Sequence, residues 1–165
     1  MTYSRFEELP VWQEAIKLVD KVYDLTESKA WPGSYSLRDQ LERAALSVSN
    51  NIAEGFERGT TNELLAFLYI ARGSAGEVRS MLCFLERREG YANLRSQISD
   101  LKSVAESCSR QLRAWADHLQ NSDIKGQRHL NEKSRAQYSS KKGAEEFEKE
   151  LYQRLPPDHP LRKGK

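Results

Sequence analysis

The sequence predicts an all-α protein: an antiparallel up-down-up-down four-helix bundle with a C-terminal extension. Apolar residues recur at alternating spacings of three and four along four segments within residues 8–121, and this is the period of one helix face. Short loops containing Gly or Pro separate the segments, and amphipathic helices joined by short loops pack antiparallel. No segment shows the alternation that is typical of a strand.

The first predicted helix covers residues 10–28. Pro10 suits its first turn, because the first N–H groups of a helix have no intrahelical partner. The second predicted helix begins near Ser36, which we expect to be its N-cap. Gly55 stands where a left-handed residue commonly ends a helix, so we expect the second helix to stop there.

The third predicted helix starts at the capping pattern Thr60-Thr61-Asn62-Glu63 and runs to about Glu89. A hydroxyl and a carboxylate three residues apart satisfy the free N–H groups of a helix start. Gly73 and Gly76 lie inside this helix, and each costs up to about 1 kcal/mol relative to Ala. We therefore interpret them as points where another helix or another subunit approaches closely.

The fourth predicted helix carries an apolar heptad series over residues 94–119. Apolar residues outside the four stripes exceed what a monomeric bundle can bury, and such a surplus marks an interface. We therefore predict a homo-oligomer. The surplus residues are Phe56, Phe67, Tyr69, Ile70 and Phe84.

The second predicted region, residues 122–165, is a basic tail. It holds 11 Lys and Arg against 7 Asp and Glu, a net charge of +4, whereas residues 1–121 carry −2. Polar and basic residues fill 122–143, so we expect a linker that is disordered or orders with a partner. Apolar periodicity returns over 144–155, which predicts a short helix that needs a docking surface.

Three motifs and the start of the chain resemble one bacterial family. They are Gln40–Val48, Asn51–Gly55, Ile70–Glu77 and the opening Phe6–Gln13. The family, which the chain resembles over roughly residues 5–120, is the four-helix-bundle family of proteins encoded in ribosomal RNA intervening sequences. It is similar to the accessory variability determinant proteins of diversity-generating retroelements. The resemblance implies a homopentamer that binds RNA or DNA and a reverse transcriptase, and it implies no catalytic residue.

The sequence also argues against an enzyme. A di-iron bundle needs Glu-x-x-His on two helices, and none of His118, His129 and His159 has Glu three residues before it. Ser47 and Ser74 have no His nearby in the sequence to act as a base. We therefore expect no enzymatic activity, metal or cofactor.

Polar residues recur along one side of the second helix. Ser47, Asn51 and Glu54 form this strip, and the carboxylates of Glu54 and Glu77 have Arg72 and Arg43 as candidate partners. Two interpretations stay open. One is a buried acid with a shifted pKa, and the other is a structural ion pair or cap, which is costly to break when it is buried.

Basic residues suggest where nucleic acid would bind, because Lys and Arg neutralise phosphates. One group, Arg87, Arg88 and Arg95, surrounds the predicted turn between the third and fourth helices. The alternative is a solvated loop. A second group lies in the tail, where solubility is the alternative role: Lys125, Arg128, Lys133, Arg135, Lys141 and Lys142.

The leading prediction is a non-enzymatic nucleic-acid-binding accessory protein that assists a partner such as a reverse transcriptase. The alternative is a protein-interaction scaffold whose tail helix docks on a partner, with no direct nucleic-acid role. Cys83 and Cys108 form no ligand cluster, so we expect no disulfide framework. No apolar run approaches the roughly 20 residues of a membrane span, and the start lacks a signal peptide. We expect a cytoplasmic protein.

Overall fold

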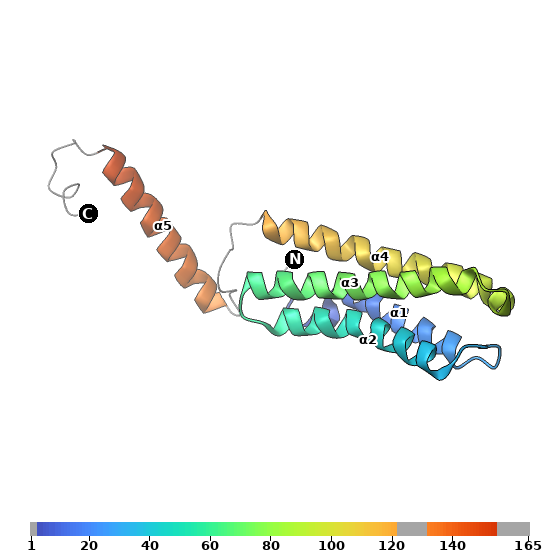
Figure 1. Ribbon diagram of the computed structural model, residues 1–165. Helices are drawn as coiled ribbons and strands as arrows, with labels where there is room; N and C mark the ends of the chain where they lie inside the picture. The colour runs from blue at the N-terminus through green and yellow to red at the C-terminus, as the bar shows by residue number, and fades with distance from the viewer. Residues whose placement is uncertain (1–2, 122–131, 155–165) are drawn as a thin grey trace. The chain divides into compact units, whose positions relative to one another are not determined.

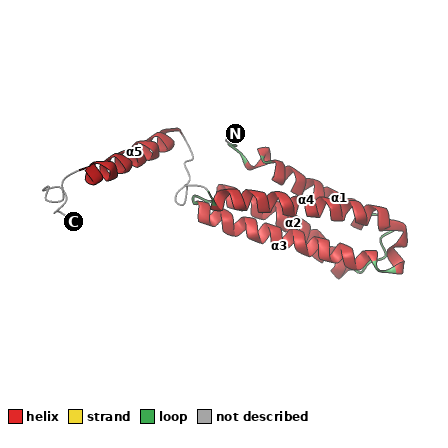
Figure 2. Cartoon of the chain, turned by 90° about the horizontal axis from the view of Figure 1, so that it is seen from above, coloured by secondary structure: helices red, strands yellow, loops and turns green. Residues whose placement is uncertain are grey.

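The computed structural model describes residues 3–121 and 132–154. Every regular element in this part of the chain is a helix, as Figure 2 shows, and the all-α prediction is confirmed. The elements are η1 (Phe6–Glu8), α1 (Pro10–Thr26), α2 (Tyr35–Glu57), α3 (Thr61–Glu86), η2 (Glu89–Leu94), α4 (Arg95–Gln120) and α5 (Glu132–Arg154), where η marks a 3-10 helix. The chain divides into two units, residues 1–127 and 128–165, and each is described by itself.

In the first unit, α1 to α4 form a bundle. The helix direction reverses at each loop (Figure 1). Helix α1 packs against α2 and α4, and α3 packs against the same two helices. One face of α3 therefore points into the bundle, and its two flanks contact α2 and α4. The remaining side of α3 faces away from the bundle.

The bundle encloses one apolar core, which the predicted stripes line. The largest fully buried side chains include Leu18, Leu41, Leu64 and Ile98, one from each helix. Burying a side chain of this size stabilises a fold by about 1.5–3 kcal/mol. The core therefore follows from the heptad spacing of the sequence.

The start of α2 differs from the prediction. Its N-cap is Ser34, whose hydroxyl accepts a hydrogen bond from the backbone N–H of Leu37 at 3.4 Å. Ser36, the predicted N-cap, lies in the first helical turn. The backbone of Ser34 is extended, at φ −67° and ψ 159°, which is typical of an N-cap. The N-cap therefore lies two residues before the predicted one.

The start of α3 follows its predicted capping pattern in part, because the Thr60 hydroxyl caps the helix but the Glu63 carboxylate accepts from that hydroxyl and not from a backbone N–H. Thr60 is the N-cap, and its hydroxyl accepts a hydrogen bond from the N–H of Glu63 at 3.2 Å. The same hydroxyl donates to the Glu63 carboxylate at 2.7 Å. The carboxylate also sits at a helix N-terminus, where negative charge is favourable.

The structure changes the predicted role of Gly55, and it shows no helix of this chain close to Gly73 or Gly76, whose approach by another subunit stays a prediction. Helix α2 continues through Gly55 to Glu57, and no described glycine has a positive φ. Gly55 is buried, and a Cβ built on it would lie 2.7 Å from the Cβ of Phe67 on α3. Gly73 and Gly76, expected at a close approach, have no atom within 4 Å of a built Cβ. Gly55 is thus the close-approach glycine inside this bundle.

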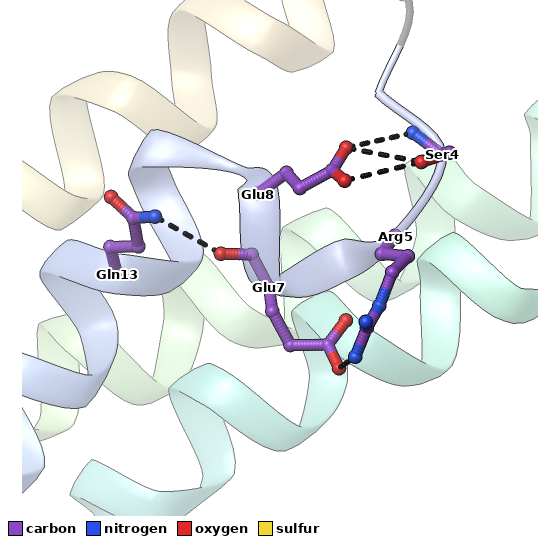
Figure 3. Close-up of polar contacts among 5 residues, drawn as sticks. All are labelled: Ser4, Arg5, Glu7, Glu8 and Gln13. Carbon is purple, nitrogen blue, oxygen red and sulfur yellow. Dashed lines mark hydrogen bonds and ion pairs between the residues drawn. The ribbon is translucent and has the colours of Figure 1, made fainter.

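The N-terminal segment is tied to α1 by polar contacts (Figure 3). The N–H and hydroxyl of Ser4 donate to the carboxylate of Glu8, at 3.0 and 3.2 Å. The N–H of Ser4 lowers the pKa of Glu8, and the guanidinium of Arg5, 2.6 Å away, lowers the pKa of Glu7. Gln13 donates to the Glu7 carbonyl at 3.1 Å, so η1 is joined to the helix that follows it.

Helix α5 of the second unit is longer than the helix expected over 144–155. It begins at Glu132, so residues 132–143 of the expected linker are helical, while residues 122–131 lie outside the described part of the chain. Ion pairs four residues apart, such as Lys142–Glu146 at 4.0 Å and Glu150–Arg154 at 3.8 Å, support a helix. Phe147 of this helix is 68% exposed.

In the described ranges, no helix combines the length and apolar character that a bilayer crossing requires.

Candidate nucleic-acid interface

Two loops meet at one end of the bundle and hold the α3–α4 turn in place. The rings of Trp31, from the α1–α2 loop, and Tyr91, from η2, pack edge to face at 5.3 Å. A Cβ built on Gly33 would lie 2.6 Å from both the Trp31 ring and the Tyr91 hydroxyl. Burial raises the pKa of Tyr91, and the charge of Arg88 opposes this shift. The turn is therefore packed against a second loop.

This turn carries the three arginines that the sequence singled out. Arg87 follows the last residue of α3, and Arg88 places its guanidinium 5.7 Å above the ring centre of Phe84. Arg95, at the start of α4, pairs with Glu89 at 3.5 Å. In the part of the chain that the structure describes, no carboxylate forms an ion pair with Arg87 or Arg88. Their two charges are therefore not neutralised locally.

The acidic residue closest to Arg87 in the sequence has another partner. The ammonium of Lys102 donates to the Glu86 carboxylate at 2.6 Å, and this hydrogen bond raises the pKa of Lys102. With Glu86 and Glu89 both paired, the turn presents a net positive charge. The two interpretations of this turn, a phosphate-binding rim and a solvated loop, both stay predictions.

Exposed aromatic rings accompany these charges, and the sequence reasoning did not include them in the site. Phe84 is 50% exposed beneath Arg88, and Tyr35, the first residue of α2, is 82% exposed. Rings of this kind stack on the bases of single-stranded nucleic acids. Their spacing in the sequence carried no signal, because Tyr35 lies at the start of α2, far along the chain from the α3–α4 turn.

The basic residues of the tail, apart from Lys125, belong to the second unit. Lys141 is exposed, and Lys142 is half-buried beside Glu146. Lys133 and Arg135 lie in α5, but their side chains are outside the description, and Lys125 and Arg128 are outside the described residues altogether. Their role stays a prediction.

The polar strip of α2 joins α2 to α3 through hydroxyl groups. The hydroxyls of Ser47 and Ser74 lie 2.8 Å apart, and the amide of Asn51 donates to the Ser47 carbonyl at 2.7 Å. Ser74 was not among the predicted members of the strip. These half-buried contacts fix how the two helices lie side by side.

Glu54 leaves the strip, so the buried-acid interpretation is wrong for it. Its side chain is 51% exposed and pairs with Arg58 at 2.6 Å, because Arg58 lies one turn further along the same helix surface. Glu77 accepts a hydrogen bond from Gln40 at 3.2 Å. The candidate partners differ too.

Arg43 pairs with Asp39 at 3.6 Å. Arg72 forms no ion pair with any residue in the described ranges. The predicted pairings of Arg43 and Arg72 with Glu54 and Glu77 are therefore replaced by shorter-range contacts along α2 and by the hydrogen bond from Gln40.

A polar cleft of about 530 Å³ opens between α2 and α3. It contains two carboxylates, one guanidinium and two serine hydroxyls, and the hydroxyls of Ser36 and Ser47 bond Ser34 and Ser74 rather than a carboxylate that could act as a base. Among the described residues, no group of His, Cys, Asp and Glu could hold a metal ion. The cleft is lined by Ser36, Asp39, Gln40, Arg43, Ala44, Ser47 and Glu77.

Comparison with known proteins identifies the family. The family model for the 23S rRNA-intervening sequence proteins matches residues 7–114. The chain belongs to this family. The match spans α1, α2, α3 and most of α4, which is the bundle. No curated protein matches the chain.

A solved structure supports the fold of this family member. The chain is similar to a Bacteroides thetaiotaomicron protein of unknown function from the S23 ribosomal protein family, with 18% identity and a TM-score of 0.57. The similarity covers 64% of this chain and 97% of that one. At this identity the likeness concerns the helical fold alone.

Proposed function

We propose that this protein is a non-enzymatic accessory protein that self-associates and binds single-stranded RNA or DNA at its α3–α4 turn. The observation that carries the proposal is the pair Arg87 and Arg88. Both lack a carboxylate partner in the described part of the chain, Arg88 lies over the half-exposed ring of Phe84, and the exposed ring of Tyr35 lies at the start of α2. Guanidinium groups bind phosphates and aromatic rings stack on bases, so together they suit a flexible strand.

Self-association strengthens the proposal. A symmetric oligomer repeats the turn once per subunit, and linked sites raise the effective concentration of each for the same strand. The family resemblance supports a homopentamer, and the exposed Tyr69 and Ile70 support burial between subunits. In this proposal the oligomer presents the strand to a protein partner such as a reverse transcriptase.

The test compares two double variants that remove the same charge. We expect Arg87→Ala with Arg88→Ala to weaken binding to a random-sequence single-stranded RNA. Each phosphate interaction that the double variant loses should flatten the slope of log affinity against log salt by about 0.7. The matched control is Arg110→Ala with Arg113→Ala, on the exposed surface of α4. Equally weakened binding in both variants would mean that only net charge matters, and unchanged binding in both would remove the turn from the proposal.

A second candidate function is a protein-interaction scaffold, and α5 is the observation that favours it. Phe147 and Leu151 lie four residues apart on α5 and are 68% and 38% exposed, so one side of this helix presents apolar surface to a partner. A scaffold of this kind predicts no salt-dependent RNA binding at physiological salt. The same titration therefore separates the two candidates.

A further inference from the structure

Helix α3 carries two arginines whose charges the bundle leaves without a counterion. Arg72 and Arg79 are about two helical turns apart, so they lie on the same side of α3. Neither guanidinium forms an ion pair with any residue in the ranges 3–121 and 132–154. Because a guanidinium stays charged in proteins, this side of α3 keeps two positive charges.

The neighbouring contacts show which side of α3 this is. Glu86 lies two turns after Arg79 and accepts a hydrogen bond from Lys102 of α4 at 2.6 Å. This hydrogen bond raises the pKa of Lys102, and the charge of Arg79 opposes the shift. Helices α3 and α4 run side by side (Figure 1). The two arginines therefore lie on the flank of α3 next to α4.

Acidic residues on the outer surface of α4 are paired within that helix. Glu106 pairs with Arg110 at 3.6 Å, and Asp117 pairs with Arg113 at 3.6 Å. The members of each pair are one turn apart on α4, so these carboxylates are neutralised by their own helix. The neighbouring flank of α3 therefore keeps the charge of its arginines.

Arg72 differs from an ordinary surface arginine in its burial. The residue is half-buried, and removing a charged group from water is costly unless the charge is paired. A bound anion on this flank would supply the missing partner. A guanidinium suits phosphate in particular, because its planar fork binds two phosphate oxygens through parallel hydrogen bonds.

The two arginines lead to the candidate site at the α3–α4 turn. Arg87 directly follows α3, and we call Arg72, Arg79 and Arg87 the α3 arginine row. At about 1.5 Å per residue, the row extends over roughly 22 Å along the helix axis. A stacked strand carries one phosphate about every 3.4 Å, so the row matches about seven nucleotides.

We propose that a single strand bound at the α3–α4 turn continues along the α4-side flank of α3, with its phosphates on the α3 arginine row. This inference rests on the proposed function and adds to it a path and a length of strand. Ile70, which supports a subunit contact, lies two residues before Arg72 and so on nearly the opposite side of α3. A subunit contact at Ile70 and a strand on the row therefore do not compete.

Strand length tests the path in the full-length protein. The probes are labelled oligoadenylates of 4 and 8 nucleotides, and binding is measured by fluorescence anisotropy. A stacked 4-mer covers about 14 Å and an 8-mer about 27 Å, so only the 8-mer reaches from the turn to Arg72. We expect the wild-type protein to bind the 8-mer more tightly than the 4-mer.

The row variant is Arg72→Gln with Arg79→Gln, because glutamine keeps a polar side chain and removes the charge. We expect this variant to lose the gain in affinity from the 4-mer to the 8-mer. For the 8-mer, the slope of log affinity against log salt should flatten by about 1.4, which is about 0.7 for each of two phosphates.

Two further variants are controls. Lys17→Gln with Lys21→Gln removes two charges from α1, which packs against α2 and α4 and lies across the bundle from α3. It should keep the length gain. Arg72→Lys with Arg79→Lys keeps the charges and should keep more of the gain than the glutamine variant. Circular dichroism shows whether each variant retains its helical fold.

The outcomes separate the row from the turn. Loss of the length gain in the row variant, but not in the α1 control, supports the path. A row variant that keeps the gain, while Arg87→Ala with Arg88→Ala weakens binding of both probes, overturns the path and leaves the proposed function standing. Equal losses in the row variant and the α1 control overturn the path, because net charge alone would explain them. Folded lysine and glutamine variants that bind equally weakly also overturn it. A wild-type protein that binds neither probe overturns both proposals.

Discussion

Gly55 of α2 faces Phe67 of α3 so closely that no side chain fits between them. A Cβ at position 55 would lie 2.7 Å from the Cβ of Phe67 and 3.2 Å from Cδ1 of Leu64. The Phe67 Cβ is bonded directly to the α3 backbone, so it cannot move away without moving the helix. Gly55 therefore sets the distance between α2 and α3 near the end where these helices connect.

Gly55→Ala should lower the free energy of unfolding by about 1–3 kcal/mol, the usual cost of overpacking a well-packed site. Gly59→Ala is the matched control. A Cβ built on Gly59 meets nothing within 4 Å, so this change should leave stability equal or slightly higher. Urea titration followed by circular dichroism measures both. Equal stabilities for the two variants would contradict the close approach at Gly55.

Thr26→Val should destabilise the bundle by about 1.5–3 kcal/mol, the contribution typical of a hydrogen bond to a charged group. The Thr26 hydroxyl donates to the Glu42 carboxylate at 2.6 Å, and Thr26 is 2% exposed. Valine keeps the shape but removes the donor. Thr26→Ser keeps the donor and serves as the control, with both measured by urea titration. A valine variant no weaker than the serine variant would show that the hydrogen bond contributes nothing.

Glu54→Ala should leave the free energy of unfolding almost unchanged. Its partner Arg58 is 46% exposed and lies one helical turn away, and exposed pairs contribute little because water and salt screen them. The difference in urea midpoint between this variant and the wild type should also be insensitive to added salt. A large loss of stability in this variant would indicate that Glu54 is covered in the assembled protein.

Thiol reactivity should separate the two cysteines. Burial raises the pKa of Cys108 to about 12, so near neutral pH its thiol should stay unreactive toward a disulfide reagent until the protein unfolds. Cys83 is half-buried and should react in the native state. Titration of free thiols before and after adding denaturant measures this. Two thiols reacting at the same rate in native protein would contradict the burial of Cys108.

Because the pKa of Cys108 is raised in the fold, this thiol should make the free energy of unfolding fall as the pH rises above neutral. In the unfolded chain a thiol ionises near pH ~8.5, while in the fold it keeps its proton to about pH 12. Its contribution is therefore fully present below the unfolded pKa and is lost as the pH rises toward the folded value. Cys108→Ala should flatten this loss in alkaline urea titrations. An unchanged slope would mean that other groups cause it.

Removing the tail should separate its role from that of the bundle. A chain ending at Asn121 keeps the apolar core of α1 to α4, so we expect it to retain its bundle helicity and oligomer mass. We expect weaker RNA binding and a salt slope that is flatter by about 0.7 for each phosphate that the tail neutralises. Unchanged RNA binding would leave the α3–α4 turn as the site. Loss of the oligomer would instead make α5 a link between subunits and favour the scaffold.

The helical fold and its core could be predicted from residue spacing, because a heptad stripe needs only local geometry and an apolar partner. The buried leucines of α1 to α4 follow these stripes. The candidate arginines could be named from sequence too. The packing of Trp31 against Tyr91, which joins the α1–α2 loop to the α3–α4 turn, could not be predicted, because this contact is long-range.

The sequence by itself determined the helices, the apolar core and the charges of each segment. Only the tertiary structure decided which glycine faces a neighbour. Gly55, Gly73 and Gly76 are the same residue in helical surroundings, yet one meets the Phe67 Cβ and two meet open space. Likewise the Glu54 carboxylate is exposed, although its place in the polar strip allowed a buried acid. The burial of a side chain depends on which helices lie beside it. This arrangement results from the packing of all four helices together and cannot be seen from one helix alone.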